Sequence, residues 1–351
     1  MYILKWIKYN LTFKQAAGTS RGVLHTKSTY FLKIWDDSTP EIVGLGECNL
    51  FAGLSSDDKP DYELVLNKVC KNVNFYVQNL DALKEWPSIR FGLEMALIDN
   101  QQGGNRLLFS TDFTNGSAGI PINGLIWMGE KRFMKNQIQE KLEQGFRCLK
   151  LKIGAIDFSD ELELIRMVRE EFSSDILELR VDANGAFEPA EALEKLKKLA
   201  VFQIHSIEQP IRQGQQSEMK QLCSQSPIPI ALDEELIGVK DSGEKEHLLN
   251  EIRPQYLILK PALLGGFSAS QEWIGLAEKQ DIPWWITSAL ESNIGLNAIA
   301  QWTYSLQSKM YQGLGTGQLY SNNVKSPLLI EKARLFYNPQ SEWDFANLNF
   351  E

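Results

Sequence analysis

The chain has 351 residues, of which 43% are hydrophobic and 23% are charged, and its formal net charge is −9. This length exceeds what one core usually holds and favours a large domain with a smaller one beside it. The negative charge argues against a general nucleic-acid binder, because such proteins need clustered lysine and arginine. No apolar run of about 18 residues occurs, so we expect no membrane span.

Cysteine and histidine are sparse and scattered. The four cysteines contain no CxxC pair, so their spacing predicts neither a zinc site nor disulfides, and a reducing cytoplasm is the expected location. Only three histidines occur. Any proton transfer is therefore expected to use another type of base.

The first hundred residues predict a small α+β domain. Strand patterns occur at 2–13, 25–35 and 41–48, and helical patterns at about 60–79 and 87–101. The three alternating stretches predict an antiparallel meander. A Gly/Ser/Thr-rich stretch near 104–120 is typical of a linker, so we expect the first domain to cover 1–110.

From residue 121 onward, strand patterns alternate with charged helical patterns. The strand patterns lie at 121–126, 146–154, 176–185, 204–210, 228–234, 256–262, 282–288 and 310–317. Eight strands separated by helices favour a (β/α) barrel over 111–317. A doubly wound sheet is the competing arrangement. We expect the tail, 318–351, to pack on the N-terminal domain.

Acidic and lysine side chains stand at the ends of five consecutive predicted strands. They are Lys152, Asp182, Glu208, Asp233 and Lys260. Because each is separated from the next by about one βα unit, we expect all five at the same height on their strands. In a barrel these ends meet at one mouth, where active sites are found.

Three of these residues predict a metal site. The carboxylates of Asp182, Glu208 and Asp233 would repel one another if no cation lay between them. Ligation by oxygen atoms alone suits Mg²⁺, for which we expect Mn²⁺ to substitute. For any one acid, a helix cap or a salt bridge explains the residue equally well, but the three together favour metal binding.

The stretch LKLKIG places two lysines on one face of a strand. Lys150 and Lys152 are expected to point into the barrel, and Leu149 and Leu151 toward the helices. Each ammonium group should lower the pKa of the other, which would help one lysine act as a base near neutral pH. Lys260 is expected to face this pair across the site.

The order of these residues resembles the muconate lactonizing subgroup of the enolase superfamily. The matching motifs are RVDANG (180–185), IEQP (207–210), LDEEL (232–236) and LKPALLGG (259–266), with TSRG (19–22) and GLGEC (44–48) in the N-terminal domain. The resemblance implies a modified TIM barrel, (β/α)7β-like, with an N-terminal α+β capping domain. It also implies a carboxylate substrate and an ene-diolate stabilised by Mg²⁺.

Within the subgroup, further stretches resemble the o-succinylbenzoate synthase family. They are LFAGLSSDD (50–58), PSIRFGLEMAL (87–97), TSALESNIG (287–295) and GLGTGQLY (313–320). Dipeptide epimerases usually carry Asp-x-Asp near the eighth strand, where this chain has GTG. The resemblance implies a hydro-lyase of menaquinone biosynthesis that dehydrates 2-succinyl-6-hydroxy-2,4-cyclohexadiene-1-carboxylate. Muconate cycloisomerase and N-succinylamino acid racemase activities stay open as alternatives.

The resemblance also implies a role for each site residue. Lys152 would remove the α-proton and then protonate the departing hydroxyl group, Lys150 would hold the substrate carboxylate, and Lys260 would act as a cation on the other face. Behind the metal ligands would lie Arg180 and Asn184, and the substrate would be bordered by Ser20, Arg21, Ser288 and Gly315. Two rival hypotheses are a metal-free lyase that uses a lysine Schiff base and a non-catalytic barrel that binds a ligand.

Overall fold

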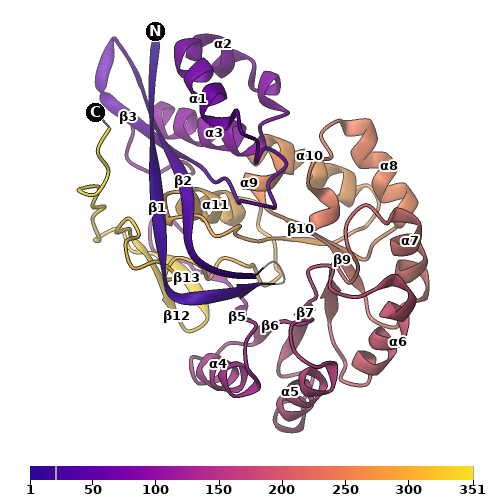
Figure 1. Cartoon of the computed structure of the whole chain (residues 1–351). Coiled ribbons are helices and arrows are strands. Elements are labelled where there is room, and N and C mark those ends of the chain that lie inside the picture. The colour runs from indigo at the N-terminus through magenta and orange to yellow at the C-terminus, as the bar shows by residue number, and fades with distance from the viewer. Residues whose placement is uncertain (20–21, 351) are drawn as a thin grey trace.

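The computed structural model describes residues 1–19 and 22–350, which form three sheets with helices around them (Figure 1). The first sheet is antiparallel and lies in the N-terminal domain. The second is parallel and has seven strands, and the third is a small sheet formed with the tail. This arrangement confirms the predicted (β/α) barrel with an α+β capping domain.

The capping domain begins with a long β-hairpin. Its strands are β1 (Tyr2–Thr19), β2 (Gly22–Asp36) and β3 (Thr39–Cys48), and its helices are α1 (Tyr62–Lys71), α2 (Val73–Gln78), the 3-10 helix η1 (Leu80–Leu83) and α3 (Pro87–Gln101). The strand order β1-β2-β3 confirms the predicted meander. The single helix predicted near 60–79 is wrong, because it divides at Asn72. The Asn72 side-chain amide donates a hydrogen bond to the Lys68 carbonyl at 3.0 Å and so competes with the helical backbone.

Two glycines in β3 let α3 lie directly against the sheet. A side chain on Gly46 would overlap the carbonyl oxygen of Gly92, and one on Gly44 would overlap the carbonyl oxygen of Ala96. Without a Cβ at these positions, the backbones of β3 and α3 approach closely. The GLGEC stretch therefore fixes where β3 ends, and it directs Glu47 toward the barrel.

The parallel sheet curls into the barrel. Its strands are β5 (Gly124–Ile126), β6 (Cys148–Lys152), β7 (Glu178–Asp182), β8 (Ser206–Glu208), β9 (Ile230–Leu232), β10 (Tyr256–Leu259) and β11 (Trp284–Ile286). They lie side by side in chain order, whereas a doubly wound sheet would reverse its order, so that alternative is excluded. The eighth predicted segment closes the ring through isolated parallel bridges, from Gln312 to Ile122 and from Gly313 to Thr287.

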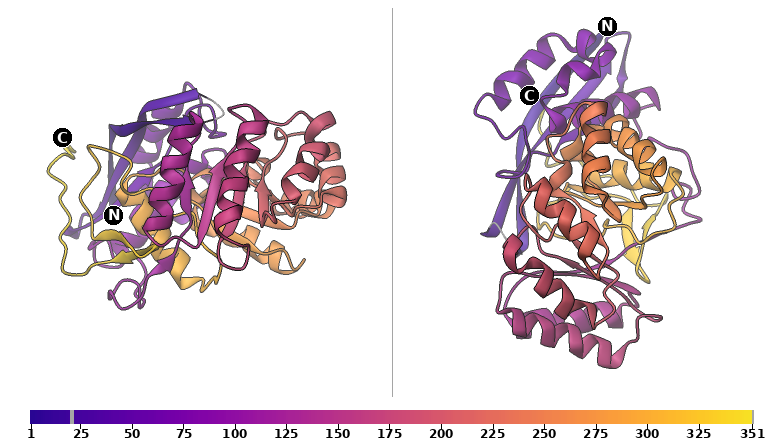
Figure 2. Two further views of the ribbon diagram at one scale, coloured as in Figure 1. Left: turned by 90° about the horizontal axis from the view of Figure 1, so that it is seen from below. Right: turned by 90° about the vertical axis from the view of Figure 1, so that its right-hand side faces the viewer.

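The helices that follow the strands form an arc outside the sheet (Figures 1 and 2). They are α4 (Lys131–Glu143), α5 (Phe158–Glu171), α6 (Pro189–Ala200), α7 (Gln216–Gln225), α8 (Ser242–Ile252), α10 (Gly266–Glu278) and α11 (Asn293–Ser305). Two short helices, the 3-10 helix η2 (Glu234–Leu236) and α9 (Pro261–Leu264), instead follow the ends of β9 and β10 directly. Leu149 and Leu151 of β6 are buried and alternate with Lys150 and Lys152, whose side chains contact carboxylates inside the barrel. The two leucines therefore point toward the helix layer, as predicted. Within residues 1–19 and 22–350, no helix combines the length and the apolar character needed to cross a membrane.

The tail after residue 318 runs back beside the capping sheet (Figure 1). The Lys14 N–H of β1 donates a hydrogen bond to the Leu319 carbonyl at 2.8 Å. Further along, β12 (Leu328–Glu331) and β13 (Arg334–Tyr337) form a sheet with β4 (Ile120–Pro121), which precedes the barrel. The tail thus contacts both parts of the chain, while the boundaries at 110 and 317 stay predictions.

Candidate active site

Strand register places three predicted site residues side by side. Lys152, Asp182 and Glu208 are the last residues of β6, β7 and β8. Lys152 pairs with Asp182, and Asp182 pairs with Glu208. Paired residues on neighbouring parallel strands point to the same side of the sheet. The predicted common height is therefore confirmed for these three.

Asp233 lies further along its strand than the other two carboxylates. Glu208 pairs with Ala231, so Asp233 follows two residues beyond the level of Glu208. Tyr256 also pairs with Ala231, so Lys260 follows four residues beyond the same level. The stagger between strands that closes a barrel produces these offsets, and the prediction of one common height is wrong for Asp233 and Lys260. Both side chains still reach the same mouth, because Lys260 contacts Asp233 and lies 3.8 Å from Glu208.

Three lysines lie among the three carboxylates. Lys150 contacts Asp182 at 3.0 Å and Glu208 at 2.7 Å. Lys152 contacts Asp182 at 3.0 Å, so both lysines of the LKLKIG stretch point into the barrel as predicted. None of the six side chains is more than 13% exposed. Their formal charges cancel, which offsets the cost of burying each charge alone.

The carboxylates hold the pKa of two lysines above its usual value. Burial alone would lower the pKa of Lys150, but the negative charges of Asp182 and Glu208 outweigh burial. The pKa of Lys260 is raised against burial by Asp233 and Glu208. The expectation that the paired lysines lower each other's pKa is therefore wrong for Lys150, because its nearest charges are carboxylates.

The carboxylates offer oxygen atoms that suit a hard cation. Burial and the neighbouring charge of Asp182 raise the pKa of Glu208 well above its usual value. The Oε1 atom of Glu208 is buried and accepts no hydrogen bond from the described residues. Carboxylate oxygens are the ligands that Mg²⁺ prefers, so the donor set fits this ion. In the described part of the chain, no three His, Cys, Asp or Glu side chains are already grouped so as to hold a metal, because lysines lie between these acids.

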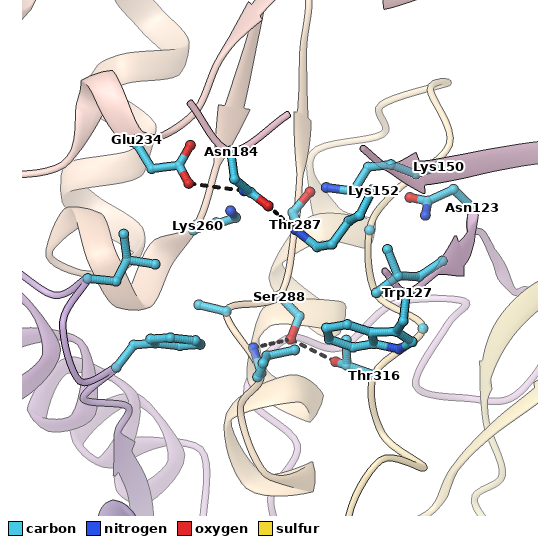
Figure 3. A pocket seen from close by; sticks show the side chains of 17 residues that line it. Asn123, Trp127, Lys150, Lys152, Asn184, Glu234, Lys260, Thr287, Ser288 and Thr316 are labelled. Atoms are coloured by element: carbon cyan, nitrogen blue, oxygen red, sulfur yellow. Dashed lines mark hydrogen bonds between the residues drawn. The ribbon is translucent and has the colours of Figure 1, made fainter. Parts of the chain in front are cut away.

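A cavity of about 790 Å³, including its opening, lies over this cluster (Figure 3). Lys150, Lys152 and Lys260 all line the cavity, and the carboxylates that they contact lie beneath them. Phe51 and Leu54 of the capping domain also line the cavity, as do Trp127 and Leu290 of the barrel. The sequence interpretation missed Phe51, Leu54 and Trp127, because single apolar residues outside a periodic pattern give no functional signal. The lining combines charged and apolar side chains, which suits a small carboxylate with an apolar ring.

Two side chains link Lys152 to the segment that carries Asp233. The Asn184 Oδ1 atom accepts a hydrogen bond from Lys152 Nζ at 2.6 Å, and its Nδ2 atom donates one to Glu234 at 3.0 Å. Asn184 has φ +43°, a left-handed conformation that Asn tolerates, and its N–H reaches Asp182 at 3.0 Å. Asn184 thus contacts both Lys152 and Asp182, and it lines the cavity itself rather than lying behind it. Glu234 was missed by the sequence interpretation, although it directly follows Asp233 in LDEEL.

Of the remaining predicted residues that the structure describes, some line the cavity and one does not. Arg180 donates hydrogen bonds to Glu178 at 2.6 Å and to the Tyr311 carbonyl at 3.0 Å, and its guanidinium lies 4.0 Å from the Trp285 ring centre. None of the hydrogen bonds found for Arg180 among the described residues reaches the three carboxylates. Both Ser288 and Gly315 line the cavity. The two residues Ser20 and Arg21 lie outside the described residues.

Comparisons with known proteins agree with the motifs of the sequence. Residues 134–336 match the enolase C-terminal domain-like family. The o-succinylbenzoate synthase of Desulfotalea psychrophila is 48% identical over 93% of this chain and 97% of that protein. The crystal structure of MenC from Desulfotalea psychrophila LSv54 has a TM-score of 0.85 and 44% identity, over 95% of this chain and 99% of that chain.

A more distant solved structure shows the same fold. The dipeptide epimerase from Cytophaga hutchinsonii, complexed with Mg and a dipeptide, has a TM-score of 0.82 at 22% identity, over 97% of this chain and 95% of that chain. The family match covers more than half of the chain, and the high identity to the synthase extends over nearly its whole length. The chain is therefore an enzyme that belongs to the enolase C-terminal domain-like family.

Proposed function

We propose that this enzyme is an o-succinylbenzoate synthase, a lyase of menaquinone biosynthesis in the cytoplasm. Its substrate would be 2-succinyl-6-hydroxy-2,4-cyclohexadiene-1-carboxylate, which loses water to form an aromatic ring. The observation that carries the proposal is the 48% identity to the synthase of Desulfotalea psychrophila over nearly all of both chains. The lysines and carboxylates at one cavity provide the groups that such a reaction needs. We also propose 1–110 as the capping domain and 111–317 as the barrel.

Asp182, Glu208 and Asp233 would hold Mg²⁺, with Mn²⁺ as a substitute. When bound, the cation supplies positive charge to the substrate carboxylate as negative charge develops there. Two observations support this assignment: the three donors are buried, and Glu208 Oε1 accepts no hydrogen bond from the described residues.

Lys152 would act first as the base and then as the acid. Its Nζ atom is oriented by Asn184 at 2.6 Å and by Asp182 at 3.0 Å, and it lines the cavity. Lys152 would take the α-proton and then return it to the hydroxyl group, which leaves as water. One lysine can perform both transfers because the proton and the hydroxyl group leave from the same face in a syn elimination.

The other two lysines would act through their charge. Lys260 comes from the end of β10 and approaches the cavity from another side than Lys152 (Figure 3). Its ammonium group, paired with Asp233, would stabilise the substrate ring. Lys150 would hold the substrate carboxylate. The succinyl chain would extend toward Ser288 and Gly315, and Ser20 and Arg21 are proposed to close over it.

The proposal is tested by turnover of the named substrate with Mg²⁺. We expect brisk dehydration by the purified enzyme and growth of a menaquinone-requiring strain that lacks its own synthase. Glu208→Gln should lose turnover at limiting Mg²⁺. The matched control is Glu235→Gln, since Glu235 is also buried but bonds Gln209 and Gly214 and does not line the cavity. Negligible dehydration beside brisk turnover of a muconate or a dipeptide would refute the proposal.

A second candidate function is racemisation of an N-succinylamino acid. The observation in its favour is that Lys152 and Lys260 approach the cavity from different sides, as a reaction with one base on each face of the α-carbon requires. We would incubate both enantiomers with the enzyme in D₂O and follow the α-proton by NMR. Absence of exchange from either enantiomer would exclude this activity.

A further inference from the structure

A second cluster of buried charges lies behind the cavity wall, and the proposed reaction does not use it. The cluster consists of Lys27 and Glu47 of the capping domain and Glu291, which precedes α11. Each of these three residues is at most 7% exposed. Such charges are seldom fully buried unless they are paired or hydrogen-bonded, so their contacts reveal what they hold in place.

Glu291 organises the wall through its two carboxylate oxygens. Its Oε2 atom accepts hydrogen bonds from the Ser288 hydroxyl at 2.5 Å and from the Ala289 N–H at 2.9 Å. Its Oε1 atom accepts one from the Asn49 side-chain amide at 3.1 Å. The Ser288 hydroxyl oxygen in turn accepts a hydrogen bond from Thr316 at 2.7 Å. Of these partners, Ser288, Ala289 and Thr316 all line the cavity.

The hydrogen-bonding capacity of Ser288 is fully used by this arrangement. Its single hydroxyl proton goes to Glu291, and its two lone pairs accept from Thr316 and from the Leu290 N–H at 3.1 Å. Leu290 has φ +61°, a strained conformation for leucine that these contacts maintain. While Glu291 accepts this proton, Ser288 has none to donate to a substrate. Ser288 instead links Glu291 to Thr316 through its two hydrogen bonds.

The capping domain holds the same carboxylate from the other side. Asn49 follows β3, and its amide also donates to the Ala289 carbonyl at 2.9 Å. Lys27 of β2 donates to the Asn49 side-chain oxygen. Lys27 therefore fixes Asn49, and Asn49 fixes Glu291. The shape of the wall depends on the docked capping domain.

We propose that Glu291 is a positioning residue for the substrate, held by Lys27 and Asn49 from the capping domain. It sets the arrangement of Ser288, Ala289 and Thr316 that the substrate meets. None of the hydrogen bonds found for Glu291 among the described residues reaches the reacting lysines, so its removal should weaken substrate binding and leave proton transfer largely intact. This inference rests on the proposed function for the identity of the substrate.

Glu47 offers a matched control in the same interface. It is fully buried and accepts hydrogen bonds from the Thr29 hydroxyl at 2.8 Å, the Ser292 hydroxyl at 2.6 Å and the Gly295 N–H at 2.9 Å. None of these partners lines the cavity. Glu47→Gln and Glu291→Gln therefore each remove one buried negative charge, but only the second disturbs the wall.

The first test compares steady-state kinetics of the two variants. In Glu291→Gln, the amide NH₂ replaces an oxygen and must face a donor, because both oxygens of Glu291 accept hydrogen bonds. We expect KM to rise about tenfold, with kcat within about threefold and unchanged Mg²⁺ affinity. Glu291→Asp, which keeps the charge, should recover part of the loss, and Glu47→Gln should keep the wild-type KM. Equal KM values in Glu291→Gln and Glu47→Gln would overturn the proposal.

A second test does not depend on turnover. Hydrogen–deuterium exchange of the Ala289 and Leu290 amides should be faster in Glu291→Gln than in the wild type and Glu47→Gln, and unchanged protection would overturn the proposal. If Glu291→Gln does not fold, Asn49→Ala should raise KM several-fold and expose the same amides, and wild-type behaviour of this variant would overturn the proposal. Absence of wild-type turnover would refute the proposed function instead, and the exchange data would still decide the role of Glu291.

Discussion

Replacing Asp182 by Asn tests the charged cluster directly, because the side chain keeps its size and loses only its charge. The Asp182 side chain is 1% exposed and contacts Lys150 and Lys152, each at 3.0 Å. Removing one partner of a buried ion pair costs about 3–5 kcal/mol. Lys150 keeps Glu208 at 2.7 Å and Lys152 keeps Asn184 at 2.6 Å, so we expect the lower end of that range.

The same substitution should remove the stabilisation that Mg²⁺ provides. A ligand at a hundred times its Kd stabilises the folded state by about 2.7 kcal/mol. Asp182→Asn removes one of three negative ligands and leaves three ammonium groups, so most of this gain should be lost. Urea unfolding in EDTA and in excess Mg²⁺ measures both effects. Loss of the ion pair lowers the free energy of unfolding in EDTA. The stabilisation by Mg²⁺ is the difference between the free energies of unfolding in excess Mg²⁺ and in EDTA.

Asp99→Asn is the matched control. Asp99 is fully buried and pairs with Arg106 at 3.0 Å, but it lies in α3 and does not line the cavity. We expect a comparable loss of stability in EDTA with the full gain from Mg²⁺. If Asp182→Asn gains as much from Mg²⁺ as the wild type, the assignment of Asp182 as a ligand is refuted. If Asp182→Asn is as stable as the wild type in EDTA, the ion pairs of Asp182 do not stabilise the fold as we argue.

Lys152→Ala should abolish dehydration, a loss of at least about 4 kcal/mol in barrier, because both proton transfers use one nitrogen, while Lys260→Arg should retain more rate than Lys260→Ala. Single-turnover rates at saturating Mg²⁺ compare these variants. An active Lys152→Ala variant together with an inactive Lys260→Ala variant would show that the base is Lys260 and that our assignment is wrong. Burial raises the pKa of Asp57 from 3.8 to about 6, so the folded state binds this proton more tightly than the unfolded chain, and the contribution of Asp57 to stability falls as pH rises from about 4 to 6. Asp57→Asn should remove this decline in urea unfolding followed against pH, and an unchanged decline would contradict the assignment. Gly46→Ala should lower the free energy of unfolding by about 3 kcal/mol, because its Cβ would overlap the Gly92 carbonyl, and wild-type stability would show that α3 can move away from β3.

The barrel and most of the charged residues at its mouth could be predicted from the amino-acid sequence alone. A βα unit needs a strand, a helix and two short connections, so polar residues at successive strand ends recur at a nearly constant interval. That regularity located Lys152, Asp182 and Glu208, whose register the structure confirms. The period-two pattern of LKLKIG likewise predicted correctly that both lysines point inward.

The features that depend on how strands and domains meet could not be predicted and are seen only in the folded protein. The offset of Asp233 comes from barrel stagger, and the closing segment pairs with Ile122 and Thr287, just outside β5 and β11, by isolated bridges rather than as a regular strand. The hydrogen-bonded chain from Lys27 through Asn49 to Glu291 joins residues from opposite ends of the sequence. Periodicity reports only which face of a local element is buried, so a contact between distant segments leaves no local pattern by which it could be predicted.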